Sequence, residues 1–177
     1  MNETPRVFVC HAHADKALCT PYVEALRMLG LDLYYNPDDP QFGYLSSTVQ
    51  DELRARKIML ALLTQDAIDS LWVKREMKTF VDLMKDDHSR ELLLVPITPC
   101  SVQTGNQSRV TLIDASEISF DAAIDTIAAA LGRPILTTGT PRSVREASRR
   151  ISRRALIGGG ALAAIAIVGG GTGWLLT

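Results

Sequence analysis

The sequence alternates short apolar runs with longer segments of helical spacing, and this alternation constrains the fold more than any other feature. Residues 58–63 are apolar at every position, which is typical of a strand buried on both faces in a parallel sheet. Further predicted strands lie at 6–10, 31–35, 92–97 and 109–113. Predicted helices lie at 16–29, from a cap at Ser46 or Ser47 to about residue 56, at 70–85 and at 120–131. The chain is therefore predicted to be an α/β protein, with a five-stranded parallel sheet covered by helices on both faces.

The strand order 2-1-3-4-5 locates the candidate ligand site in such a flavodoxin-like sheet. Ligands bind where the strand order reverses, beyond the carboxyl ends of the first and third strands. Those ends are residues 10–15 and 64–70. A phosphoacceptor receiver domain has the same five-strand pattern but needs an aspartate at the end of its third strand. Leu63 and Thr64 stand there, which excludes that class.

Glu76 is an unusual residue in the predicted helix at 70–85. It lies beside the apolar stripe of the helix, with Trp72 one turn before it and Phe80 one turn after it. None of its neighbours three or four positions away is basic, so it cannot form an ion pair of the common local kind. Burying a carboxylate between aromatic side chains costs desolvation free energy. Glu76 is therefore predicted either to have a distant structural partner or to have a function.

Charge is distributed unevenly along the chain. The net charge is −1, but residues 142–154 contain six arginines and one acid, which leaves the remainder with a net charge of −6. An acidic globular part excludes nucleic acid as an expected partner. The three cysteines, Cys10, Cys19 and Cys100, have no disulfide-framework spacing and indicate reduced thiols in the cytoplasm. The polar N-terminus predicts no secretion signal.

The C-terminal part differs in character from residues 1–132, the predicted globular domain. Residues 133–154 are predicted to be a linker, rich first in proline and glycine and then in arginine. Residues 155–176 carry no charge and would extend roughly 33 Å as a helix, enough to cross a membrane. The arginines before them predict a single-pass transmembrane helix with the globular domain in the cytoplasm. Two alternatives are a twin-arginine export signal around 152–156 and a glycine-rich tail without structure.

Residues 6 to about 132 resemble a TIR (Toll/interleukin-1 receptor) domain. The segment 8–12, Phe-Val-Cys-His-Ala, stands where the first motif of that family does, at the end of a strand. Residues 37–44 stand where the family has the loop after its second strand. Ser70, Trp72 and Glu76 match the family's S-x-W-x-x-x-E pattern in the helix after the third strand.

This resemblance implies one of two functions. Many TIR domains cleave the nicotinamide–ribose bond of NAD+, giving nicotinamide and ADP-ribose or a cyclic isomer, and become active on self-association. Others are non-catalytic signalling adaptors that act by homotypic assembly at the membrane. For an enzyme the resemblance implies that Glu76 is catalytic and that NAD+ is the substrate, with no cofactor. The implied substrate-binding residues are Ser70, Trp72, His11, Ala12, His13, Phe42, Gly43 and Tyr44.

The chemistry of a carboxylate agrees with this assignment. Loss of nicotinamide leaves oxocarbenium character on the ribose, which a carboxylate stabilises. Other chemistry is less well supported by the sequence. Cys10, His11, His13 and Cys19 carry atoms that bind zinc, but their spacing matches no zinc motif, and no metal is predicted. Cys100 has no base near it in sequence and is not predicted to be a nucleophile.

Overall fold

Five parallel strands form the centre of the molecule in the order β2-β1-β3-β4-β5, which confirms the predicted topology. The computed structural model describes residues 4–36, 45–102 and 109–132. The strands are β1 (Arg6–Cys10), β2 (Asp32–Tyr34), β3 (Ile58–Leu63), β4 (Glu91–Pro96) and β5 (Val110–Leu112). The helices are η1 (His13–Asp15, a 3-10 turn), α1 (Lys16–Met28), α2 (Ser47–Ala55), α3 (Gln65–Asp69), α4 (Leu71–Asp86) and α5 (Phe120–Ala130).

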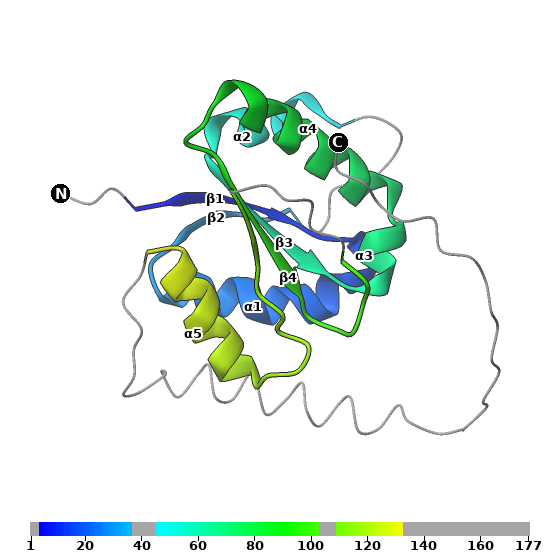
Figure 1. Ribbon diagram of the computed structural model, residues 1–177, viewed down its shortest axis with the longest axis vertical. Helices are drawn as coiled ribbons and strands as arrows, with labels where there is room; N and C mark the ends of the chain where they lie inside the picture. The colour runs from blue at the N-terminus through cyan, green and yellow to red at the C-terminus, as the bar shows by residue number, and fades with distance from the viewer. Residues whose placement is uncertain (1–3, 37–44, 103–108, 133–177) are drawn as a thin grey trace.

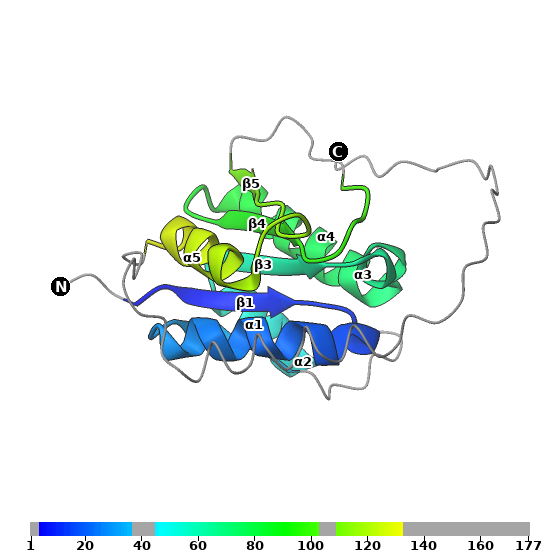
Figure 2. The same ribbon diagram turned by 90° about the horizontal axis from the view of Figure 1, so that it is seen from below.

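Helices cover both faces of the sheet, and each face has its own apolar core. Helices α2 and α4 lie on one face, and α1 and α5 lie on the other (Figure 1). Figure 2, seen from the side of α1 and α5, shows β1, β3, β4 and β5 side by side. Side chains alternate along each strand, so Val7 and Val9 join the core under α1 and α5, whereas Phe8 and Cys10 join the core under α2 and α4. Residues 58–63 of β3 are buried on both sides, as predicted.

The chain between β3 and α4 contains a short helix that the sequence did not predict. Residues 65–69 form α3, and Thr64 caps it by accepting a hydrogen bond from the backbone N–H of Ala67 at 3.0 Å. Ser70 both ends α3 and begins α4, where its hydroxyl accepts from the N–H of Val73 at 3.3 Å. A single residue thus separates the two helices, and this fixes the position at which α4 starts.

Arginines stand at the amino ends of four strands. Arg90, just before β4, is buried and donates to the carbonyl oxygens of Leu53 (3.0 Å), Arg54 (2.7 Å) and Arg56 (2.8 Å) at the end of α2. Leu53 and Arg54 lie in the last turn of α2 and Arg56 follows it, where carbonyls lack a partner within the helix. Arg90 therefore joins the end of α2 to the start of β4. The other arginines of this set are Arg6, Arg56 and Arg109.

The predicted linker at 133–154 and the predicted transmembrane helix at 155–176 lie outside the described residues. Among the helices that the structure describes, none is long and apolar enough to cross a membrane. The last described residue, Gly132, has a φ of 72°, a left-handed conformation that suits glycine after a helix. The predicted end of the globular helix at this glycine is thus confirmed.

Candidate active site

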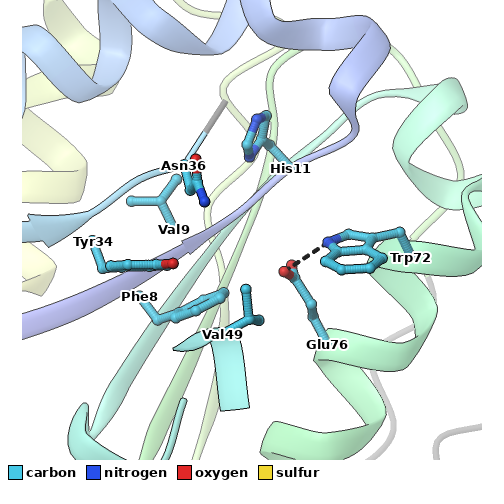
Figure 3. Close-up of a pocket in the computed structure, with 8 residues that line it drawn as sticks. All are labelled: Phe8, Val9, His11, Tyr34, Asn36, Val49, Trp72 and Glu76. Atoms are coloured by element: carbon cyan, nitrogen blue, oxygen red, sulfur yellow. Dashed lines mark hydrogen bonds between the residues drawn. The ribbon is translucent and has the colours of Figure 1, made fainter. Parts of the chain in front are cut away.

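A small pocket lies at the carboxyl end of β1, between the sheet and α4. Figure 3 shows Glu76 and Trp72 projecting from α4 toward the strands, with His11 and Asn36 across from them. The pocket is at the edge where the strand order reverses between β1 and β3, as the sequence predicted from topology. It is lined by Phe8, Val9, His11, Tyr34, Asn36, Val49, Trp72 and Glu76.

Glu76 is held from its own helix by Trp72. Glu76 is buried, with only 5% of its surface exposed. The indole Nε1–H of Trp72 donates a hydrogen bond to Glu76 Oε1 at 2.8 Å. The two residues are four positions apart, and the helix therefore brings their side chains to the same face. No basic residue lies three or four positions from Glu76 in the sequence. The neutral indole of Trp72, one turn earlier, reaches the carboxylate instead.

Cys10 approaches Glu76 from the sheet. Cys10 is fully buried at the end of β1, on the face of the sheet that α2 and α4 cover. Burial raises the pKa of the Cys10 thiol well above its ordinary value, and the negative charge of Glu76 raises it further. The thiol is therefore protonated at neutral pH. The sequence singled out Cys10 only as a weak zinc candidate, although strand alternation places it on the same face as Phe8.

His11 contributes a neutral imidazole to the pocket. It is 4% exposed, and its Nε2 is buried without a hydrogen-bond partner among the described residues. Its ring lies 4.7 Å from the ring of Tyr35, centroid to centroid. Burial, and secondarily the charge of His13, lowers the pKa of His11 to about 4. His11 thus carries no charge at neutral pH and has an unused nitrogen in the site, which suits contact with an uncharged polar group.

The other predicted site residues occupy different surroundings. Ala12 is buried in the core under α2 and α4, while His13 is exposed in η1. Ser70 caps α4 and does not line the pocket as described. The segment with Phe42, Gly43 and Tyr44 lies outside the described residues. The substrate-binding roles assigned to these residues remain predictions.

A buried hydrogen bond joins the two loops at the site. Thr64 donates through Oγ1 to Asp15 Oδ2, and both residues are buried. Asp15 ends η1 after β1, and Thr64 begins α3 after β3. Burial raises the pKa of Asp15, whereas the hydrogen bond from Thr64 opposes that rise. The contact fixes the loop that carries His11 against the start of α3, and no sequence pattern predicts this pairing.

The pocket that the described residues enclose is small. Its cavity volume is about 10 Å³, room for about one water molecule. Within the part of the chain that the structure describes, no three His, Cys, Asp or Glu side chains gather closely enough to hold a metal ion. Cys10 and Cys19 both carry sulfur atoms that could bind zinc, but they belong to the cores on opposite faces of the sheet.

Comparison with known families identifies the class of this protein. A family model described as the TIR domain matches residues 7–128, and the chain therefore belongs to the TIR domain family. Among solved structures, it is similar to the TIR domain of the Toll-related receptor TRR-2 from Hydra magnipapillata. That comparison has 16% sequence identity and a TM-score of 0.46, and it covers 62% of this chain and 84% of the other. A comparison with curated protein sequences gave no significant match.

Proposed function

We propose that this TIR domain is an NAD+ glycohydrolase that cleaves the nicotinamide–ribose bond and releases nicotinamide with ADP-ribose or a cyclic isomer. The observation that carries the proposal is the Glu76 carboxylate, 5% exposed and held by the Trp72 indole at 2.8 Å. It lies at the ligand-binding edge of the sheet. The indole is a neutral donor, so this hydrogen bond orients the carboxylate without cancelling its charge.

Such a carboxylate is suited to a positively charged transition state. Breaking the nicotinamide–ribose bond leaves oxocarbenium character on the ribose, and a preorganised negative charge in a site of low dielectric stabilises it strongly. Nicotinamide leaves as a neutral base, and this chemistry therefore needs no strong acid. The neutral imidazole of His11 can contact an uncharged amide or hydroxyl group of the substrate.

The size of the pocket supports control by self-association. A cavity of about 10 Å³ cannot accept a pyridine ring, so the site must widen before NAD+ enters. Our proposal is that contacts between several TIR copies supply this change, and that residues 155–176 concentrate the copies on a membrane with the TIR domain in the cytoplasm. NAD+ depletion of this kind would suit an immune defence role in a prokaryotic cell.

The test is nicotinamide release by the full chain, free and clustered on lipid vesicles, followed by chromatography. Glu76→Gln keeps the size of the side chain and removes the charge, and we expect a loss of about a thousandfold in rate. Glu24→Gln is the matched control, because Glu24 is exposed on α1. Deletion of 155–176 should keep the protein off the vesicles. Absence of nicotinamide release in every clustered state of folded protein would disprove the enzyme.

The small cavity also favours an alternative function, that of a non-catalytic signalling adaptor. In that case the Trp72–Glu76 pair stabilises α4 and assembly with other TIR domains is the output. The vesicle assay separates the two functions. An adaptor assembles without releasing nicotinamide, and Glu76→Gln leaves its assembly unchanged.

A further inference from the structure

His11 has a hydrogen-bonding atom that the described residues leave unused. The residue is 4% exposed, and its Nε2 is buried without a hydrogen-bond partner among those residues. Buried polar atoms nearly always have a partner, because an unsatisfied one costs free energy. His11 also lines the small pocket beside Glu76. Its Nε2 therefore marks a position where a polar group of a ligand would be stabilised.

Contacts from neighbouring elements hold the imidazole of His11 in place. Its ring packs on that of Tyr35 at 4.7 Å between centroids, and the Tyr35 hydroxyl shares a hydrogen bond with Thr20 Oγ1 of α1 at 2.9 Å. The bond between Asp15 and Thr64 fastens the loop that follows His11 to the start of α3. A group that is already held in place loses little freedom on binding, which favours a selective contact.

The position of His11 in the pocket suits the base of the proposed substrate. Figure 3 shows His11 and Asn36 across the pocket from Glu76. Positive charge develops on the ribose in the proposed reaction, so the ribose has to lie at Glu76. The base is on the other side of the breaking bond and is therefore directed toward His11 and Asn36. A carboxamide both donates and accepts hydrogen bonds, and it satisfies Nε2 in either tautomer, whereas a carboxylate only accepts.

The charge of the pocket also favours an amide over an acid. Burial lowers the pKa of His11 to about 4, so its imidazole is neutral at pH 7. Among the described residues that line the pocket, Glu76 is acidic and none is a lysine or an arginine. A base that carries a carboxylate would bring a second negative charge into this site of low dielectric, where like charges repel strongly.

We propose that His11 is a specificity-determining residue: its Nε2 binds the carboxamide of nicotinamide, and the site thereby selects dinucleotides with an amide-bearing base over those with a pyridine carboxylate. This selectivity rests on the proposed NAD+ glycohydrolase function, which places the base opposite Glu76. A single water is the competing partner of Nε2, since the cavity of about 10 Å³ has room for one. The test therefore follows free bases as well as dinucleotides.

The first measurement needs no cleavage. Binding of free nicotinamide and free nicotinate to the full chain, clustered on lipid vesicles, is followed by ligand-detected NMR at pH 7. The parent should bind nicotinamide at least about tenfold more tightly than nicotinate. His11→Leu removes both ring nitrogens and should weaken nicotinamide binding about tenfold, with little change for nicotinate. His11→Gln keeps a donor and an acceptor and should stay close to the parent.

The second measurement compares kcat/KM for NAD+ and for nicotinic acid adenine dinucleotide. The parent should prefer NAD+ by at least about a hundredfold. His11→Leu should reduce that preference about tenfold, mainly through a higher KM for NAD+. His88→Leu is the matched control, because His88 is exposed, and it should change neither substrate. If His11→Leu does not fold, His11→Phe replaces it and keeps an aromatic ring against Tyr35.

The outcomes separate this inference from the proposed function. Equal binding of the two bases by the parent, or a preference that survives in His11→Leu and His11→Phe, would assign Nε2 to a water and overturn the inference. An equal loss for both dinucleotides would also overturn it, because His11 would then contact a group that they share. A preference for nicotinamide without release from NAD+ would keep the amide subsite and reject the glycohydrolase. Neither binding nor release would reject both.

Discussion

Buried polar and charged side chains have different kinds of partners at the two ends of the parallel sheet. At the amino ends, Arg90 reaches three carbonyl oxygens at 2.7 to 3.0 Å and the carboxylate of Asp87 at 3.3 Å. Arg56 pairs with Glu52 at 2.6 Å and Asp32 at 3.1 Å. At the carboxyl ends, Glu76 accepts a hydrogen bond from the neutral indole of Trp72, and the Nε2 of His11 has no hydrogen-bond partner among the described residues.

This difference separates a structural end from the end that holds the proposed active site. Ionic and carbonyl partners offset the cost of burying the guanidinium groups, and the arginines therefore serve the connection between helices and strands. A neutral donor such as the Trp72 indole orients a carboxylate without neutralising it. The contrast predicts that substitutions at the amino ends cause the largest loss of stability, whereas substitutions at the carboxyl ends change activity or the dependence of stability on pH.

The largest expected effect on stability is that of Arg90→Met. It removes the donor to three carbonyl oxygens at the end of α2 and should lower the free energy of unfolding by about 3 kcal/mol. Arg54→Met is the control, because the Arg54 side chain is 62% exposed and should cost less than about 0.5 kcal/mol. Urea denaturation measures both. Equal losses in the two variants would remove the proposed contrast between the ends.

The second effect is a pH dependence that His11 contributes. Folding lowers its pKa from 6.5 to about 4, so the unfolded chain binds a proton in this window that the native protein does not. The free energy of unfolding should therefore fall as pH is lowered, by about 2 kcal/mol from this residue between pH 7 and pH 5. His11→Gln should flatten that slope, and the exposed His88→Gln should not. An unchanged slope in His11→Gln would contradict the buried neutral imidazole.

Ser70→Ala should have the smallest effect. Loss of the cap on α4 costs about 1 kcal/mol of stability. Ser119→Ala removes the equivalent cap of α5, far from the proposed chemistry in sequence, and should cost about the same. The KM for NAD+ then tests the predicted substrate contact of Ser70. A rise confined to Ser70→Ala supports that contact, whereas an equal KM in both variants assigns Ser70 to capping.

The fold followed from the sequence because its signals are local. The continuous apolar run at 58–63 gave β3 with its boundaries, and glycines gave the helix ends at Gly30 and Gly132. Short α3 was missed because residues 64–70 were treated as a connection, and five residues carry too little periodicity to reveal a helix.

The site was predicted only in part. Topology and the pattern of Ser70, Trp72 and Glu76 led to the pocket, but its hydrogen bonds join residues that the sequence does not relate. Cys10 and Trp72 are far apart in the chain and share a core only when α4 packs on β1. The Thr64–Asp15 bond likewise needs both loops in place. Such contacts depend on packing and leave no periodic signal.

The single residue between α3 and α4 has a consequence for how chain length can vary. Because Ser70 ends one helix and begins the next, the junction has no spacer that could absorb an added residue. One residue inserted after Ser70 would turn the rest of α4 by about 100° relative to its cap. Trp72 and Glu76 would then leave the pocket together. A substitution of Ser70 removes only the cap of α4, whereas a change of chain length at this junction would displace both pocket residues of the helix.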